Sequence, residues 1–497
     1  MTEPREVRNG PDSQEDLAGV VSHALRGLFG RDSVYMLLWG VQVVLAALVT
    51  PLLTRALAPP QFGDVAAANA VMQVAFVLAG LGLYTAIQRH FARSADREEV
   101  ARLLGFSIIA AVGVAACVDL TGPLWAEALG FRSYSGPVRI AVLWAGVSAV
   151  TNGALALLRS QDRLAAFGMV SLLQSVIAEA ASLLLVVLVA PSATMFLLGQ
   201  FGVQTLAALI ALVLARPRIP RLQDRSLIRA ALTFGLPLVP AVLSTFVLNS
   251  ADRLIVQSEL GSTAVARYQV AYNVGALPML LLGVLNTSWM PRIFSFTEVR
   301  ERTAILAASR DMLYRLLIPV LLGMAAGAPL ILRLWAPPEY GPDALLMVNA
   351  LVLVGAIPYT AGLAATRSLM AEGRTGYIAV AQGVAATLNV VLNLVLIPPL
   401  GLTGSAAATL VALVVLNVLM QRRARALIRV ARPTGGIILG LAGAGCLVLL
   451  IALIPAGSAL IARLVVGLAC LAWFTFVFIT RTGVRPSRRR GGPETGG

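Results

Sequence analysis

Charged side chains inside long apolar segments are the residues of this sequence that could do chemistry. Glu179 lies in the middle of one such segment, Asp119 near the end of another, and the adjacent Asp252 and Arg253 close a third. A charge in hydrocarbon costs about 3 kcal/mol on insertion scales, so each one needs an explanation. We predict Glu179, Asp119 and Asp252 as candidates for coupling to a proton or sodium gradient. For Glu179 the alternative is a structural carboxylate that is protonated or paired with arginine, and for Asp119 a carboxylate with access to water.

Two further groups of polar residues could bind a ligand. Arg55, Arg253 and Arg267 lie at the ends of apolar segments, and guanidinium groups bind phosphate oxygens bidentately. We predict them as candidates for binding an anionic substrate; the alternative is a set of anchors that reach to the membrane interface. Asn389 and Asn393 are one helical turn apart on one face. They either line a cavity or bond neighbouring helices.

The sequence carries no pattern typical of an enzyme. It has only 2 His and no Lys, so a Walker loop and a His-based metal or catalytic centre are not expected, and neither GxSxG nor HExxH occurs. Cys117, Cys446 and Cys470 fall inside apolar segments, where small packing residues are expected rather than a metal site or disulfides. We therefore predict a protein that is not an enzyme, with no metal and no bound cofactor.

Composition decides the class of protein. The chain of 497 residues is 58% hydrophobic and 13% charged, with a mean hydropathy of +0.83, which one soluble core could not hide. Its apolar segments have the length that crosses a hydrocarbon layer about 30 Å thick. The net charge of +15 comes from arginines between these segments rather than on one face, so nucleic acid is not a predicted partner. We predict an all-α integral membrane protein with about 14 transmembrane helices at residues 33–54, 65–87, 104–126, 138–158, 166–189, 194–215, 235–257, 265–289, 312–334, 344–365, 376–397, 403–420, 435–455 and 460–480.

The arginines also predict the orientation. With both termini in the cytoplasm, only seven of the 39 fall on the outer side or in the outer halves of spans: Arg55, Arg132, Arg139, Arg253, Arg267, Arg333 and Arg463. The positive-inside rule requires this asymmetry. The predicted outer links are short and leave no room for the catalytic domain of a membrane polymerase or glycosyltransferase.

A weak internal repeat relates spans 1–6 to spans 7–12. Its matched features occur in the same order: Arg55 eight residues before Gly63 and Arg253 eight before Gly261, Arg159-Ser160 and Arg367-Ser368, Gln174–Ala178 and Gln382–Ala386, and Pro191 and Pro398. Six spans is an even number, so both halves share one orientation and are related by an axis along the membrane normal. This is the parallel-repeat arrangement of transporters.

The repeat predicts the division of the chain. A cytoplasmic arm at residues 1–32 includes an amphipathic helix, and six-helix bundles follow at 33–230 and 231–430. An added helix pair occupies 431–480, and a basic tail at 481–497 is predicted to be disordered and to touch anionic lipid.

Several stretches resemble the polysaccharide-export, or oligosaccharide flippase, branch of the multidrug/oligosaccharidyl-lipid/polysaccharide exporter superfamily. They are Arg55–Gly63, Phe234–Pro240 leading to Asp252-Arg253, Ala328-Pro329 through Glu339-Tyr340, and Ser368–Arg374 followed by Asn389–Thr409. The resemblance covers spans 1 to 12. It implies two bundles around a central cavity, and a lipid-linked oligosaccharide or polysaccharide precursor moved to the outer leaflet by alternating access.

Related lipid II flippases carry a charged pair where this chain has Asn273 and Val274, which favours another envelope polysaccharide, such as O-antigen of lipopolysaccharide, capsule, exopolysaccharide or teichoic acid. The expected location is the bacterial cytoplasmic membrane. The expected partners are the lipid-linked oligosaccharide, membrane lipids and polysaccharide-synthesis proteins. The alternatives are a small-molecule or drug exporter of the same superfamily, a membrane polysaccharide polymerase or ligase, and a scaffold for envelope synthesis.

Overall fold

The computed structural model describes residues 49–482 except 95, 135, 284–285, 287–297, 428–429, 456 and 458–459. The predicted amphipathic arm, most of the first predicted span, part of the eighth and nearly all of the basic tail lie outside the described residues. Within this part of the chain every regular element is a helix. The predicted all-α fold is confirmed.

Twelve of the described helices are long and apolar enough to cross a membrane. They match the predicted spans 2 to 7 and 9 to 14, and α13 (Ser262–Gly275) begins the eighth. The spanning elements are α3 (Pro59–Gly80), α5 (Arg97–Leu120), α7 (Pro137–Ser160), α8 (Leu164–Leu172) with the π-helix η2 (Leu173–Ile177) and α9 (Ala178–Leu188), α10 (Ala193–Ala215), α12 (Leu238–Leu260), α15 (Val299–Trp335), α16 (Leu346–Ala371), α17 (Thr375–Leu400), α18 (Leu402–Leu427), α19 (Gly435–Leu453) and α20 (Leu460–Thr482).

The second predicted span is broken into two helices, α3 and α4 (Leu83–Ser94). Leu81 and Gly82 have φ of 47° and 68°, in the left-handed region that ends a helix. A side chain on Gly82 would overlap the carbonyl oxygen of Gly235, because the end of α11 (Arg225–Gly235) crosses this turn. The break therefore depends on a partner far away in the sequence, which the apolar pattern does not reveal.

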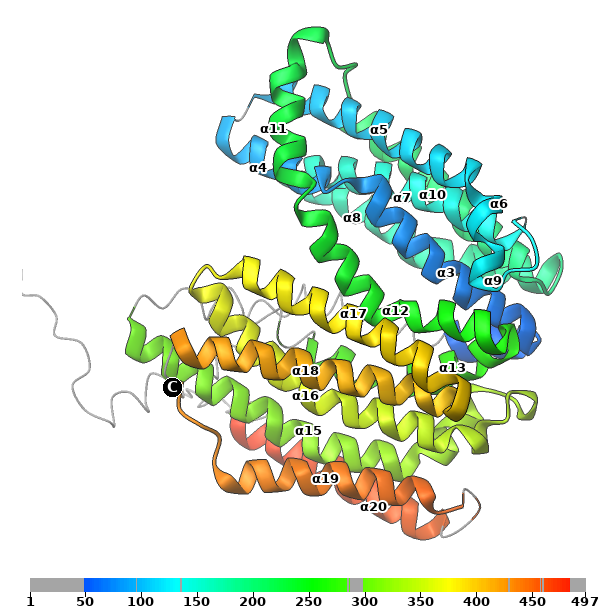
Figure 1. Ribbon diagram of the computed structural model, residues 1–497, viewed down its shortest axis with the longest axis vertical. Helices are drawn as coiled ribbons and strands as arrows, with labels where there is room; N and C mark the ends of the chain where they lie inside the picture. Colours follow the sequence, from blue (N-terminus) through cyan, green and yellow to red (C-terminus); the bar gives the residue numbers. More distant parts are fainter. Residues whose placement is uncertain are drawn as a thin grey trace, which may run out of the picture.

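Small residues allow the helices to pack closely into two bundles (Figure 1). In the N-terminal bundle, α7 contacts α3, α4, α5 and α10. In the C-terminal bundle, α16 contacts α13, α15 and α18, while α17 contacts α12 and α18. The added pair, α19 and α20, packs on α15.

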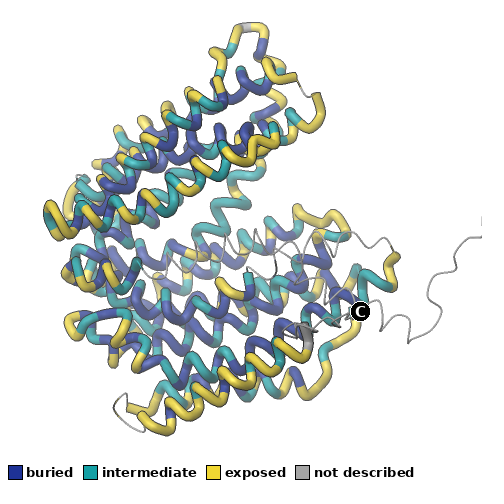
Figure 2. The backbone as a smooth tube through the Cα atoms, turned by 180° about the vertical axis from the view of Figure 1, so that it is seen from behind, coloured by how far each residue is buried: buried dark blue, intermediate teal, exposed yellow. Residues whose placement is uncertain are grey.

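Large apolar side chains also cover much of the outer surface of both bundles. Leu124, Leu188, Leu439 and Ile461 are all exposed, and Figure 2 shows exposed residues along the outward faces of the helices. Such an apolar surface is stable against lipid and not against water. It supports the membrane location of the described helices.

The two bundles diverge at the end where α4 and α11 lie and meet at the opposite end (Figure 1). The contact is made by α3 against α12 and α13. By the predicted orientation, the diverging end is cytoplasmic and the meeting end is outer.

We name the contact at the meeting end the outer junction and define it by Gly63, Asp64, Gly130, Gln257 and Ser262. The Ser262 hydroxyl donates to Asp64 Oδ1, and Gln257 Nε2 donates to the Gly130 carbonyl at 3.3 Å and to Ser262 Oγ at 3.0 Å. A side chain on Gly63 would overlap the backbone carbonyl of Ser262. The absence of a Cβ therefore allows the two helix ends to touch.

The outer junction also joins positions that the internal repeat makes equivalent. Gly63 matches Gly261, so Asp64 matches Ser262, and these two side chains bond to each other. A contact between equivalent positions is what a two-fold axis produces where it passes through an interface. The arrangement agrees with two pseudo-symmetric bundles.

The orientation predicts which loops can be labelled from outside. In a variant whose three cysteines are replaced by alanine, Glu339→Cys should react with a membrane-impermeant thiol reagent in intact cells, because Glu339 is exposed in the loop after α15. Arg221→Cys, in the arginine-bearing link after α10, should react only after permeabilisation. Labelling of Arg221→Cys in intact cells would contradict the predicted orientation.

Gly63→Ala should force the outer junction apart, because the new methyl group meets backbone rather than a movable side chain. We expect a longer distance between spin labels at Ala128 and Glu339, which lie at the outer ends of the two bundles, and a lower melting temperature, at a cost of about 1–3 kcal/mol. Gly80→Ala is the control, since a Cβ on this residue of the same helix meets nothing within 4 Å. Equal distances in both variants would show that the contact does not hold the bundles together.

Candidate functional site

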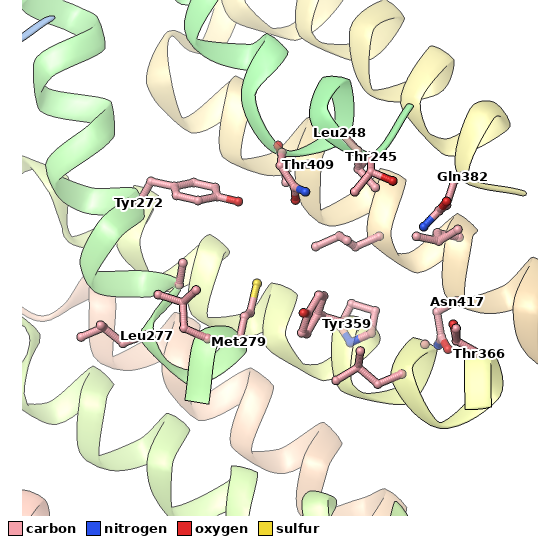
Figure 3. A pocket seen from close by; sticks show the side chains of 18 of the residues that line it. Thr245, Leu248, Tyr272, Leu277, Met279, Tyr359, Thr366, Gln382, Thr409 and Asn417 are labelled. Carbon is pink, nitrogen blue, oxygen red and sulfur yellow. The ribbon is translucent and has the colours of Figure 1, made fainter. Parts of the chain in front are cut away.

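A cavity of about 660 Å³ lies among α12, α13, α15, α16, α17 and α18, with Thr50 at the end of the first span on its wall. Figure 3 shows the side chains of Tyr272, Met279, Tyr359 and Gln382 around the open space. The described lining residues include no charged side chain. The polar ones are Thr50, Thr245, Asn249, Tyr272, Asn273, Tyr359, Thr366, Gln382, Thr409 and Asn417.

A buried ion pair on α12 lies behind this wall. The side chains of Asp252 and Arg253 are 1% and 6% exposed, and Arg253 Nη1 lies 2.6 Å from Asp252 Oδ1. Tyr268 of α13 donates its hydroxyl to Asp252 Oδ2 at 2.7 Å, and the guanidinium lies 4.0 Å from the ring centre of Tyr272, which lines the cavity. Arg253 also donates to the carbonyl of Asn249. A buried pair is tolerated only with such full hydrogen bonding.

One chain of hydrogen bonds runs from this ion pair to the cavity. Arg253 Nε donates to Gln269 Oε1 at 3.0 Å, and Gln269 Nε2 donates to Asn273 Oδ1 at 2.7 Å. Asn273 Nδ2 then donates to Thr50 Oγ1 at 3.1 Å. Gln269 and Asn273 are four residues apart on α13 and therefore share a face. The chain connects the ion pair to the cavity wall and to the end of the first span.

A second chain passes through the two predicted asparagines. Ser405 lies beside Tyr268, and its hydroxyl donates to Asn393 Oδ1 at 2.8 Å. Asn393 Nδ2 donates to the Asn389 carbonyl at 2.8 Å, and Asn389 Nδ2 donates to Thr409 Oγ1 at 3.2 Å. Both asparagines are fully buried and bond α17 to α18. They reach the cavity through Thr409, which lines it. We call Asp252, Arg253, Tyr268 and these two chains the polar network.

The other two predicted arginines lie near the outer junction and bond to backbone carbonyls. Arg55 Nη2 donates to the Leu334 carbonyl at 2.8 Å and so caps the end of α15. Arg267 Nε donates to the Tyr340 carbonyl at 3.1 Å. The structure does not place the three arginines in one cavity, and none is among the described lining residues. Their binding to a substrate stays a prediction.

Glu179 lies two residues after the π-helix η2, in the N-terminal bundle. It lies beside Gln200 of α10, and its Oε2 is buried with no hydrogen-bond partner among the described residues. Gln204, one turn further along α10, donates to the Gln174 carbonyl inside the π-helix at 3.1 Å. Glu179 is thus not paired with an arginine in the described part of the chain, and π-helices often occur at functional positions.

Asp119 has arginine and tyrosine partners. Both of its carboxylate oxygens accept from Arg139, at 3.2 and 3.3 Å, and Oδ1 also accepts from the Tyr134 hydroxyl at 2.8 Å. These bonds tie the end of α5 to the beginning of α7. Among the described residues, no group of three or more His, Cys, Asp or Glu side chains is placed to hold a metal ion.

Tyr268 and Gln269 are the functional candidates that the sequence analysis missed. Their signal was present in the spacing, because Tyr268 and Tyr272, and likewise Gln269 and Asn273, recur four residues apart in a largely apolar span. A polar stripe of this kind within a predicted span indicates a face turned toward other polar groups.

Comparison with known proteins gives one family and several similar folds. The family model described as "polysaccharide biosynthesis protein" matches residues 30–297. The lipid II flippase MurJ in an inward closed conformation is 14% identical, with a TM-score of 0.71 over 91% of this chain and 100% of that one. An inward-facing multidrug resistance MATE family transporter is 15% identical, with a TM-score of 0.64 over 82% and 98%. A transporter from Pyrococcus furiosus is also 15% identical, with a TM-score of 0.55 over 84% and 98%.

No curated protein matches the sequence. At such identities the similar structures establish the fold, and all three belong to one superfamily of transporters or share its fold. The family model covers more than half of the chain and agrees with the resemblance carried by the sequence motifs. The chain therefore belongs to the polysaccharide biosynthesis protein family of the multidrug/oligosaccharidyl-lipid/polysaccharide exporter superfamily.

Proposed function

We propose that this membrane transporter is a flippase for a lipid-linked oligosaccharide or polysaccharide precursor. It moves the precursor from the inner to the outer leaflet of the bacterial cytoplasmic membrane for cell-envelope polysaccharide biosynthesis. The observation that carries the proposal is a hydrogen-bonding cavity whose described lining carries no charge, in a chain whose two bundles meet, over the described helices, at the predicted outer end. The family's description supports the same substrate class.

The chemistry of the cavity wall fits a saccharide. Amide and hydroxyl side chains both donate and accept hydrogen bonds, as sugar hydroxyl groups require. Tyr272 and Tyr359 add aromatic rings that can cover the apolar faces of sugar rings. The volume of about 660 Å³ is that of a site for one compact ligand. The cavity would hold a short saccharide unit while the lipid tail stays in the bilayer.

Transport would follow from opening and closing at the two ends. In the conformation described, the outer junction is closed and the bundles diverge at the predicted cytoplasmic end. Alternating access requires the outer junction to break as the cytoplasmic end closes. The polar network connects the cavity wall to α12, which contacts both bundles, so occupancy of the cavity can bias this change.

Export of a small molecule is the second candidate function. The same uncharged wall, with Met279 and Tyr359 beside its apolar side chains, suits a neutral or cationic amphiphile. A polymerase, a ligase or a scaffold has no feature in the described residues that favours it. The two transport functions differ in what accumulates when the protein is absent.

The experiment measures lipid-linked saccharide in each leaflet of a strain that lacks the gene. The flippase proposal expects the precursor to accumulate in the inner leaflet and complementation to restore it in the outer leaflet. If the distribution is unchanged while sensitivity to toxic amphiphiles rises, the exporter is the better proposal.

The same assay tests the polar network. Arg253→Ala leaves Asp252 buried without its partner, at a cost of about 3–5 kcal/mol, and should lower the amount of inserted protein. The double variant Asp252→Asn, Arg253→Gln removes both charges, so we expect normal insertion but less than about a tenth of the export, a loss of roughly 1.4 kcal/mol or more. The control is Asp343→Asn with Arg333→Gln, which neutralises the exposed pair at 2.8 Å. Normal export by the first double variant would make the network structural and leave the flippase proposal standing.

Glu179 is proposed as a site of proton coupling, because it is partly buried and one carboxylate oxygen has no described partner. Glu179→Gln keeps the shape and the ability to accept a hydrogen bond but cannot titrate. Its export should no longer depend on the pH gradient across the membrane, while exposed Glu127→Gln behaves as wild type. Full dependence on the pH gradient in Glu179→Gln would assign Glu179 a structural role.

A further inference from the structure

A second, smaller pocket lies within the C-terminal bundle. It has a volume of about 80 Å³ and lies between α15, α16, α18 and the link to α19, at the predicted cytoplasmic ends of these helices. It shares no lining residue with the cavity. We call it the arginine pocket and define it by Arg310, Tyr314, Ser368, Gln421, Arg425 and Arg432.

A fourth arginine is buried beside this pocket. Arg367 of α16 is 1% exposed and is the residue immediately before Ser368. Its Nη1 donates to Ser309 Oγ at 3.1 Å, but Nε and Nη2 are buried with no hydrogen-bond partner among the described residues. The side chain interacts electrostatically with Tyr314 and Arg310, two residues of the pocket wall. A buried guanidinium with two unused donors is rare in a native protein and indicates a missing partner.

The carboxylates near this end do not balance the charge. Asp311 lies 2.7 Å from Arg310, and Glu372 lies 2.9 Å from Arg302. Arg310 also donates to the Ala431 carbonyl at 2.6 Å, and Arg425 donates to Gln421 at 2.6 Å. Thus Asp311 is the one described carboxylate paired at the pocket, against the four arginines Arg310, Arg367, Arg425 and Arg432. Arg367 is buried and Arg310 is partly buried, so their positive charges are unfavourable without an anion, and the exposed Arg425 and Arg432 add to the positive charge around the pocket.

We propose that the arginine pocket binds a phosphate-bearing anion, one phosphate group in size. Arg310 and Arg425 would offer donors directly, and Arg367 would supply a buried positive charge behind them. Guanidinium groups match the geometry of phosphate oxygens, and the hydroxyl of Tyr314 can donate as well. Bound there, the anion ties together α15, α16, α18 and the link that leads to the added helix pair.

Free phosphate and a phospholipid headgroup share this chemistry. The experiment has one arm for each source, using the full chain purified in neutral detergent. In the first arm, the melting temperature is measured against increasing inorganic phosphate, with chloride replaced to keep the ionic strength constant. In the second arm, the protein is placed in nanodiscs of phosphatidylcholine with or without phosphatidylglycerol, and the retained lipid is measured by native mass spectrometry.

We expect a saturable rise in melting temperature with phosphate, or selective retention of phosphatidylglycerol; either result supports the pocket and identifies the source. Arg425→Gln should weaken the binding roughly 10- to 100-fold, the value of one charge-assisted hydrogen bond. Arg422→Gln is the matched control, because it removes the same charge from an exposed position on the same helix outside the pocket.

Arg367→Gln should weaken the binding similarly. If that variant does not insert, exposed Arg425 still carries the test. The proposal is overturned if neither phosphate nor phosphatidylglycerol binds saturably, or if Arg425→Gln and Arg422→Gln bind alike. None of these outcomes depends on which substrate the cavity carries.

Discussion

The contact between the beginnings of α3 and α13 is the constraint on which the rest of the structure depends. It is possible only because Gly63 has no side chain to meet the Ser262 carbonyl, and it is fastened by the bond from Ser262 to Asp64. Where the bundles touch, their described helices are in direct contact at the predicted outer end. Everything proposed about access to the cavity follows from the state of this one contact.

The interior of the C-terminal bundle holds both a buried ion pair and, beside it, a cavity for a ligand. A charged pair in a membrane interior is expensive, and none of the described residues of the cavity wall carries a formal charge. Asp252 and Arg253 lie behind the cavity wall rather than in it, and amide and hydroxyl side chains connect them to the wall. A ligand in the cavity therefore contacts oriented amide and hydroxyl dipoles rather than the ions themselves. This suits a ligand that is neutral where it touches the wall.

The sequence alone predicted the spans well, because a hydrocarbon layer of nearly constant thickness imposes one length on every helix. It did not predict the break at Leu81-Gly82 or the helix α11, since the first depends on Gly235 and the second is too short to be recognised as a span. The sequence also predicted which residue types form the candidate site, but it did not predict which residues they bond to. Arg55 bonds a carbonyl that is 279 residues away in the chain, and no local pattern contains that information. The repeat was more informative, because Asp64 and Ser262, which it makes equivalent, are in contact.

The crossing of Gly82 and Gly235 has a mechanical consequence. It pins the chain at the point where α11 passes into α12, and α11 belongs to the described connection between the two bundles. The helix α12 is 23 residues long, or about 35 Å, and its far end reaches the residues around Ser262. If α12 tilts as one rigid unit, the contact between Gly82 and Gly235 fixes the end about which it tilts. A tilt of about 10° about this fixed end would move the other end of α12, next to Ser262, by ~6 Å. This is twice the length of a hydrogen bond, so it is enough to break the outer junction.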